Sequence, residues 1–212
     1  ENVATGLAAG YWRMARKPAC TLLHCGPGLA NGLGNLHNAR RARSGIVNIV
    51  GDQATYHRPL DAPLTADTDA LAHSVSQWVH TSTQPSALGF DAAMAVRAAN
   101  TYPGQVATLI LPADVSWGEG GEVGLPLAAP QPPAIDPHAV DNAARALGSN
   151  QNVLILLAGP AALAEGQALA WRVASATGAA VMLDYVTAHV ARGQGRLPLE
   201  RVPYGMNAAI KA

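Results

Sequence analysis

A glycine-rich segment near the start of the chain has residue types that could bind a phosphate group. Residues 26–32 read GPGLANG and follow an apolar run, and Asp52 follows the next apolar run, residues 46–50. A loose glycine pattern of this kind can hold a dinucleotide pyrophosphate at a helix N-terminus, with an acidic side chain on the ribose. Pro27, however, lacks a backbone N–H, and the third glycine comes one position late. A plain strand–helix turn is therefore an equally good interpretation.

His24 ends the apolar run before this segment. At that place an imidazole, which titrates near neutral pH, could act as a general acid or base. A core histidine bonded to the backbone is an equal alternative on the pattern alone. No pair among the 7 histidines has metal-ligand spacing together with a carboxylate, so no metal site made by this chain alone is predicted. Glu1, as an isolated charged residue, indicates no chemistry by itself.

The elements around these residues are predicted to be a strand, a helix and a second strand. The apolar runs at residues 19–25 and 46–50 are typical of buried parallel strands. Between them, apolar residues recur at helical spacing from Leu29 to Ala39, and residues 26–28 are expected to form a tight turn before this helix. Because such units bind ligands beyond the carboxyl ends of their strands, His24 is expected at a binding edge.

The rest of the chain continues the alternation of helices and strands. A long loop is predicted over residues 52–65 and is expected to be functional, because loops of this length rarely serve only as connections. The first predicted helix, residues 1–16, has an apolar stripe made by Val3, Leu7, Ala8, Tyr11 and Met14. Further helices are predicted at residues 67–78, 85–102, 137–147 and 161–177, and further strands at 79–82 (an edge strand), 106–111, 153–157 and 179–183.

A stretch rich in glycine and proline divides the chain after residue 116. Such composition is typical of a linker. The sequence therefore predicts a first domain over residues 1–116, a linker over 117–135 and part of a second domain over 136–212. The fold class predicted for both domains is α/β, and the first is expected to have three layers in which a parallel sheet is flanked by helices.

Composition argues against several classes of partner. The 14 basic and 14 acidic residues balance, which disfavours nucleic acid and membrane surfaces as partners. Cys20 and Cys25 fit neither a disulfide framework nor a zinc site, so a reducing cytoplasm is predicted. No apolar run approaches the roughly 20 residues of a membrane span. The charged fraction of only 13% indicates a tightly packed protein that forms oligomers.

Several spaced motifs in the first half of the chain occur in the order found in one enzyme family. They are Glu1, Gly10-Tyr11, Lys17-Pro18, GPGLAN at residues 26–31 and Gly51-Asp52-Gln53. In this order they resemble the pyrimidine-binding domain of thiamine-diphosphate-dependent enzymes of the acetolactate synthase, pyruvate oxidase and benzoylformate decarboxylase group. The resemblance extends to about Asp114, and residues from 136 onward resemble the start of that family's central domain. It implies a pyrimidine-domain fold that lacks its N-terminal part.

The resemblance also implies roles for individual residues. Glu1 matches the glutamate that hydrogen-bonds the aminopyrimidine ring of thiamine diphosphate and shares a proton with it, which activates the cofactor for attack on a 2-oxo acid. Pro27 and Asn31 match residues that pack near the pyrimidine. His24 matches a catalytic histidine of benzoylformate decarboxylase-like members, where acetolactate synthases usually carry threonine. Leu64 matches a substrate-pocket position that is leucine in the decarboxylase and glutamine in acetolactate synthases.

Other parts of the family's site do not occur in this sequence. The resemblance implies Mg²⁺ that binds the diphosphate through a Gly-Asp-Gly motif followed by paired asparagines, and neither motif is present. Mg²⁺ is therefore expected to be supplied by a domain absent from this chain, while FAD binding is left open. In the family the cofactor lies between two subunits, so a homodimer or homotetramer is expected. The chain alone is expected to be inactive.

The leading interpretation is a fragment of a thiamine-diphosphate-dependent 2-oxo acid decarboxylase or carboligase, that is, a lyase or transferase. His24 and Leu64 favour a decarboxylase-like pocket, whereas the GPG turn is more similar to acetolactate synthase. One alternative is an oxidoreductase that binds a nicotinamide dinucleotide through the glycine segment and Asp52. Another is a non-catalytic structural or regulatory subunit. Which 2-oxo acid is used is left open.

Overall fold

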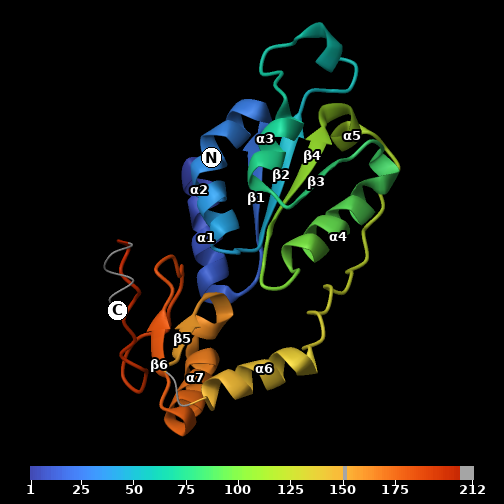
Figure 1. The fold of residues 1–212 in the computed structure, drawn as a ribbon. Helices are drawn as coiled ribbons and strands as arrows, with labels where there is room; N and C mark the ends of the chain where they lie inside the picture. The colour runs from blue at the N-terminus through green and yellow to red at the C-terminus, as the bar shows by residue number, and fades with distance from the viewer. Residues whose placement is uncertain (150–151, 206–212) are drawn as a thin grey trace. The chain divides into compact units, whose positions relative to one another are not determined.

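The structure, a computed structural model, describes residues 1–149 and 152–205 (Figure 1). Residues 206–212, which the sequence assigns to the second domain, lie outside the described residues. The chain forms two compact units, Glu1–Pro132 and Pro133–Ala212, and each has its own parallel sheet. In the part of the chain that is described, no helix is both long and apolar enough to cross a bilayer.

The first unit is built on a four-stranded parallel sheet with the strand order β1-β2-β4-β3. Its strands are β1 (Ala19–His24), β2 (Ile46–Asp52), β3 (Trp78–Thr81) and β4 (Val106–Pro112). The apolar strands β2 and β4 lie in the middle of the sheet and are buried almost throughout, as expected for parallel strands covered on both faces. The prediction of a parallel α/β sheet with β3 at its edge is confirmed.

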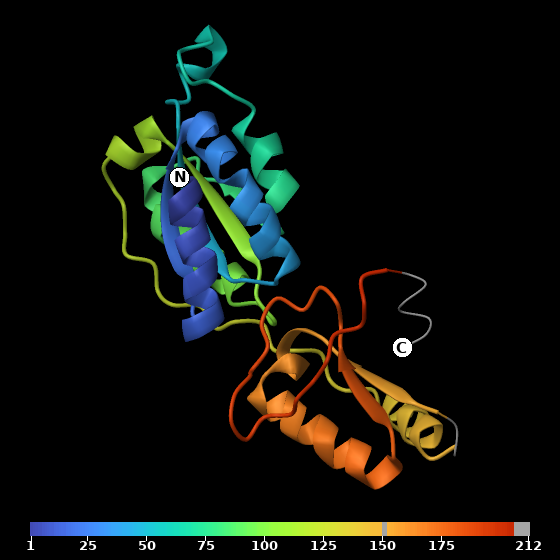
Figure 2. The ribbon, with the colours of Figure 1, turned by 90° about the vertical axis from the view of Figure 1, so that its left-hand side faces the viewer.

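Helices cover both faces of this sheet, so the predicted three layers are confirmed (Figure 2). The main helices are α1 (Asn2–Ala15), α2 (Cys25–Arg41), α3 (Thr68–Val75) and α4 (Leu88–Ala99). Residues of α1, α2 and α3 form one core with Ile46 and Val50 of β2, and residues of α4 form a second core with Val47. Since successive strand side chains point to opposite faces, these two cores lie on opposite sides of the sheet. Shorter helices are α5 (Ala113–Trp117), η1 (Arg58–Leu60) and η2 (Pro85–Ala87).

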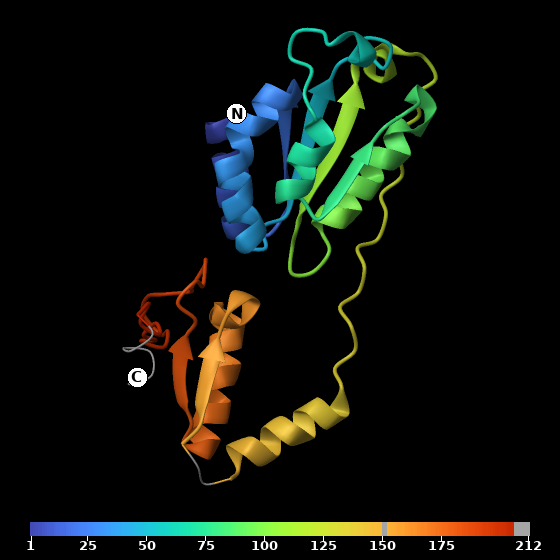
Figure 3. The ribbon, with the colours of Figure 1, turned by 45° about the horizontal axis from the view of Figure 1, so that its top comes forward.

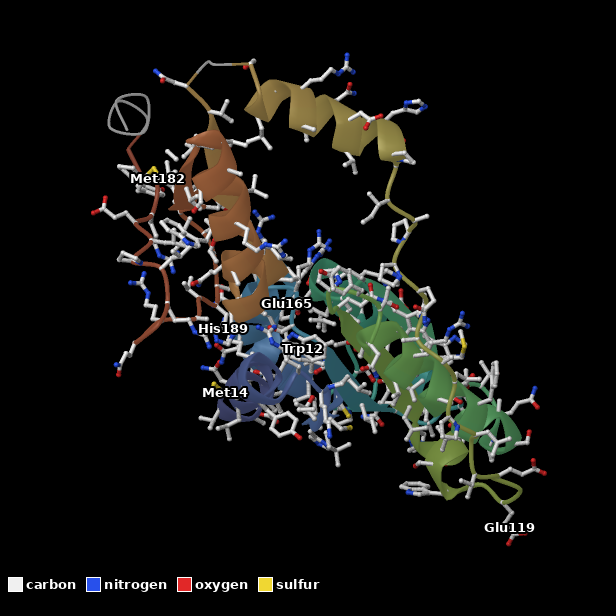
Figure 4. All side chains as sticks on the ribbon, turned by 90° about the horizontal axis from the view of Figure 1, so that it is seen from below. Trp12, Met14, Glu119, Glu165, Met182 and His189 are labelled. Carbon is white, nitrogen blue, oxygen red and sulfur yellow. The ribbon has the colours of Figure 1, made fainter. Side chains whose placement is uncertain are left out.

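Of the apolar stripe predicted for helix α1, only Ala8 is buried. Its buried residues are Thr5, Ala8, Ala9 and Trp12, whereas Val3, Leu7, Tyr11 and Met14 are exposed. Figure 4 labels Trp12 and Met14, which are 7% and 83% exposed. The physical reason is close packing, because a Cβ on Gly32 of α2 would lie 2.9 Å from the Thr5 methyl group. Small side chains let the two helices approach, and the larger apolar ones remain outside.

The expected tight turn at residues 26–28 is wrong. Helix α2 begins at Cys25, directly after β1, so these residues form its first turn. The left-handed backbone conformation falls on Cys25, with φ 55°, and not on a glycine. Pro27 is tolerated because the first N–H groups of a helix have no intrahelical partner.

Two other predicted helices are shorter than expected. The helix predicted to reach residue 78 ends at Val75, because Gln77 leaves it to pair with β4: its N–H donates to the Val106 carbonyl and its Oε1 accepts from the Val106 N–H. Its predicted start is confirmed, since the Asp67 side chain accepts from the Ala70 N–H as an N-cap. The helix predicted over residues 85–102 is divided into η2 and α4.

The second unit contains a smaller parallel sheet and two α-helices. Its elements are α6 (Pro137–Leu147), β5 (Leu154–Leu157), η3 (Gly159–Ala162), α7 (Ala164–Thr177) and β6 (Ala180–Leu183). Strands β5 and β6 pair in parallel. Leu157, Ala162, Ala170 and Leu183 form its small core. The α7 helix begins later than predicted, because the short η3 helix takes the residues before it.

Candidate functional site

Three of the predicted site residues meet at the carboxyl end of β1 and the start of α2. The Oε2 atom of Glu1, the N-cap residue of α1, accepts a hydrogen bond from Asn31 Nδ2 on α2 at 3.3 Å. A Cβ built on Gly28 would lie 3.0 Å from Glu1 Oε1 and 3.3 Å from the Cβ of His24. Because Gly28 has no side chain, there is space in which the Glu1 carboxylate lies. Glu1, His24 and Asn31 surround this space.

Strand β1 positions His24 at the surface. Thr21 and Leu23 of this strand are buried, whereas Cys20, Leu22 and His24 are exposed, which is the alternation expected of a strand. The interpretation of His24 as a buried core histidine is therefore wrong.

Pro27 is exposed in the first turn of α2, next to Gly28. Asn31 is also exposed and lies four residues further along the helix, so both residues share one side of it. The structure thus gives Pro27 a place beside the Glu1–Asn31 pair.

Leu64 lies in the loop between β2 and α3, which extends beyond the carboxyl ends of β1, β2 and β4 (Figure 3). Its side chain is 45% exposed, and its φ of 71° is left-handed. A Cβ built on Gly26 would lie 2.3 Å from the Cβ of Ala66, two residues after Leu64. The end of this loop therefore packs against the first turn of α2, close in sequence to Gly28.

The Asp52 carboxylate, on which the dinucleotide alternative depends, is already paired. Its Oδ2 lies 2.7 Å from Nη2 of Arg58, and its Oδ1 accepts from the Gln53 N–H at 2.8 Å. Only 1% of the Asp52 side chain is exposed. A ribose hydroxyl needs an accessible carboxylate, and Asp52 does not offer one in this arrangement.

Two groups at this end of the sheet have shifted pKa values with identified causes. Burial raises the pKa of the Cys25 thiol, and the Asp52 carboxylate raises it further, which disfavours a reactive thiolate. Hydrogen bonds from the side chain and backbone of Thr55 lower the pKa of Asp114.

A family model identifies the segment that carries these residues. The model described as thiamine pyrophosphate enzyme, N-terminal TPP binding domain, matches residues 1–83. The N-terminal part of the chain is therefore similar to the thiamine pyrophosphate-binding N-terminal domain of this enzyme family. The prediction made from the ordered motifs is confirmed, and all five predicted site residues lie within the matched segment.

Individual relatives agree with this family. IlvX of Mycobacterium tuberculosis (strain ATCC 25618 / H37Rv), a candidate acetolactate synthase large subunit, is 46% identical over 206 residues, which are 96% of this chain and 39% of IlvX. Two solved structures share the fold at 19% identity, each over 98% of this chain and 40% of theirs. They are a candidate thiamin diphosphate-dependent enzyme from Mycobacterium smegmatis (TM-score 0.81) and the thiamine diphosphate-dependent 4-hydroxybenzoylformate decarboxylase of Rhodococcus jostii RHA1 (TM-score 0.79).

The chain spans about 40% of the length of these relatives. The matches favour neither the nicotinamide dinucleotide alternative nor the non-catalytic one. The ion pair of Asp52 with Arg58 points the same way, because the dinucleotide alternative requires an Asp52 carboxylate that is free to bind a ribose.

The residues of the matched segment, 1–83, fit one part of the cofactor. The Glu1 carboxylate, which accepts a hydrogen bond from the Asn31 amide and lies next to Gly28, can exchange a proton with a ring nitrogen. The pyrimidine ring of the cofactor has such nitrogens. Magnesium and the diphosphate need a cluster of oxygen ligands. Across residues 1–149 and 152–205, no group of three or more His, Cys, Asp or Glu could hold a metal ion. The pair of Glu1 and Asn31 therefore fits the pyrimidine ring.

Two features of the site were not assigned a role from the sequence. The sequence predicts Gly28 only as part of a turn, whereas in the structure its missing side chain leaves room for the Glu1 carboxylate. Gln53 was seen only as part of a motif, although its side chain donates to the Pro63 carbonyl. A glycine within a helix indicates close backbone approach, but the sequence predicts a turn at Gly28, and only the structure places it in α2. No local pattern predicts the Gln53 contact.

Proposed function

We propose that this chain supplies the pyrimidine-binding side of a thiamine-diphosphate site that decarboxylates a 2-oxo acid. The observation that carries the proposal is the Glu1 carboxylate held over Gly28 by Asn31, within the segment that the family model matches. The cofactor, when bound, supplies a nucleophilic carbon and accepts the electron pair that departing CO₂ leaves behind. The role of this chain is to bind and orient the cofactor and to move protons.

Glu1 is the proposed proton-exchanging group toward the pyrimidine. Asn31 donates to its Oε2, so Oε1, the oxygen nearer Gly28, is the atom left to meet a ring nitrogen. An amide that fixes one carboxylate oxygen also fixes the direction of the other. Asn31 is thus a positioning residue, and Pro27 is proposed to contact the ring from the same side of α2.

His24 and Leu64 are the proposed substrate-side residues. The exposed imidazole of His24, beside Gly28, can give a proton to the substrate-derived carbon or oxygen after CO₂ leaves. Leu64 would provide an apolar wall, which suits a 2-oxo acid with an apolar side chain. Decarboxylation agrees with the activity of the Rhodococcus jostii 4-hydroxybenzoylformate decarboxylase, which shares the fold. Acetolactate formation is the second candidate, because the relative at 46% identity is a candidate acetolactate synthase large subunit.

The site is proposed to be completed by further polypeptide, in a homodimer or homotetramer. One support is the side of α1 opposite its buried residues, where Val3, Leu7, Tyr11 and Met14 form an exposed apolar row beside Gly6 and Gly10. A row of this kind is typical of an interaction surface. A second support is that the described residues contain no group of three or more His, Cys, Asp or Glu that could hold the Mg²⁺ that the diphosphate would require.

The test is equilibrium binding of thiamine diphosphate with Mg²⁺ to the intact protein, followed by separate assays with benzoylformate and pyruvate. We expect binding, CO₂ release, and a loss of about 10²–10⁴-fold in kcat for Glu1→Gln, since this variant cannot exchange the proton. Bound FAD would appear as a flavin absorbance spectrum. Binding of NADH without binding of thiamine diphosphate would overturn the proposal.

A further inference from the structure

The loop between β2 and α3 is held by side chains at its two ends. Gln53 Nε2, at the start of the loop, donates to the carbonyl oxygen of Pro63 at 2.5 Å. Thr55 donates to the Asp114 carboxylate through its N–H, at 3.1 Å, and through its hydroxyl. The ion pair between the buried Asp52 and the partly exposed Arg58 adds a third contact. These interactions join the loop to itself and to α5.

The Gln53 contact acts on the peptide group directly before Leu64. The Pro63 carbonyl and the Leu64 N–H belong to one rigid peptide plane, so a hydrogen bond to this oxygen fixes the orientation of that plane. Leu64 has a φ of 71°, in the left-handed region that residues with a side chain rarely adopt. Such conformations persist only where the surrounding structure enforces them, and they gather at functional sites.

The position of Leu64 in the fold gives this conformation a consequence for the site. Ala66, two residues later, packs against Gly26 in the first turn of α2. The Gln53 contact fixes the chain before Leu64, and the Ala66 contact fixes it after Leu64. A rotation of the Pro63–Leu64 peptide between these two contacts would therefore turn the Leu64 side chain. The direction of the Leu64 side chain depends on the Gln53 hydrogen bond.

We infer that Gln53 is a positioning residue that sets substrate specificity by holding Leu64 in its left-handed conformation. The inference rests on the proposed function, because it takes Leu64 as a wall of the substrate pocket. Gln53 acts only through the Pro63–Leu64 peptide and has no contact with substrate or cofactor in this role. Loss of its hydrogen bond changes the shape of the pocket and therefore the preference between large and small 2-oxo acids.

The test variant is Gln53→Glu in the intact protein, which keeps the side-chain length and removes the N–H donor. Hydrogen exchange, measured without cofactor or substrate, is expected to become about fivefold faster in residues 54–65, the factor for one typical hydrogen bond. The ratio of kcat/KM for benzoylformate over pyruvate is expected to change by about the same factor, with unchanged thiamine diphosphate affinity. Gln84→Glu, at an exposed glutamine outside the loop, is the matched control and should change neither quantity.

A second variant separates backbone strain from folding defects. Asparagine tolerates the left-handed conformation better than leucine, so Leu64→Asn added to Gln53→Glu is expected to restore slow exchange without restoring specificity. This double variant also serves if Gln53→Glu alone does not fold. Unchanged exchange in Gln53→Glu overturns the inference, and so does faster exchange with an unchanged specificity ratio. Failure of thiamine diphosphate to bind overturns the proposed function instead, since the exchange experiment contains no cofactor.

Discussion

Asn31 donates a hydrogen bond to the Glu1 carboxylate across 3.3 Å, although 30 positions separate the two residues. The contact is possible because Gly28, one turn before Asn31, has no side chain where the carboxylate lies. Glu1 is the N-cap residue of α1, yet a residue of α2 sets the orientation of its side chain. A change in α2 can therefore alter the chemistry of Glu1 without touching it.

The first prediction concerns this hydrogen bond. Asn31→Ala removes the donor to Glu1, and we expect about tenfold weaker binding of thiamine diphosphate, because a hydrogen bond to a charged group contributes about 1.5 kcal/mol. Isothermal titration calorimetry of the intact protein with Mg²⁺ measures the affinity. Asn35→Ala is the control, since Asn35 lies one turn later on α2 and bonds to Asn2 instead. Equal affinities in the two variants would contradict the role of Asn31.

The second prediction concerns the space above Gly28. The Cβ of a Gly28→Ala variant would lie 3.0 Å from Glu1 Oε1, so the carboxylate must move, and we expect weaker cofactor binding and lower kcat. Gly34→Ala is the matched control on the same helix, because nothing lies within 4 Å of its added Cβ. That control should raise the free energy of unfolding by about 0.5–1 kcal/mol and leave binding unchanged. Normal binding by Gly28→Ala would show that Glu1 has another route to the pyrimidine.

How far the sequence predicts the fold depends on the kind of signal. The central strands β2 and β4 could be predicted from their apolar, β-branched runs, because burial on both faces demands that composition. The buried side of α1 could not. The larger apolar residues, such as Leu7, indicate one side, but the close approach of Thr5 to Gly32 selects the other. Helix packing distance is a tertiary property and leaves no periodic pattern in one helix.

The sequence likewise predicts some features of the candidate site and not others. His24 could be placed at the binding edge because it ends a recognisable strand. The partners of Gln53 and Asp114 could not be predicted, since each contact joins residues that the sequence alone does not bring together. The family resemblance supplies Glu1 and Leu64 as candidates, but only the structure shows that Asn31 holds Glu1.

The third prediction concerns pH. Hydrogen bonds from Thr55 lower the pKa of Asp114, so the folded protein binds this proton less readily than the unfolded chain does. The resulting stabilisation is present above the unfolded pKa, about 3.9, and disappears as the pH falls through the lower folded value. Thr55→Val should therefore lower Tm at neutral pH and make less difference under strongly acidic conditions. Thr83→Val, at an exposed threonine, is the control, and an equal Tm difference at both pH values would contradict the account.

A chain of buried polar side chains crosses the middle of the sheet. Thr21, Asn48 and Thr108 lie on adjacent positions of β1, β2 and β4. The Thr21 hydroxyl donates to Asn48 Oδ1 at 2.8 Å, and Asn48 Nδ2 donates to the Thr108 hydroxyl at 3.0 Å. The Ser76 hydroxyl lies 2.7 Å from that of Thr108. Because all four residues are almost completely buried, each lost partner would leave a polar group without water.

The fourth prediction follows from the central place of Asn48 in this chain. Asn48→Leu fills a similar volume but leaves the hydroxyls of Thr21 and Thr108 short of a partner, so the free energy of unfolding should fall by about 2–4 kcal/mol. Urea unfolding measures it, with Asn38→Ala on the exposed side of α2 as the control that changes it by about 0.5 kcal/mol or less. Adding Thr21→Val to Asn48→Leu removes one of the unpaired hydroxyls and should recover part of the loss. Simple addition of the two single effects would mean that the side chains do not act as one hydrogen-bonded unit.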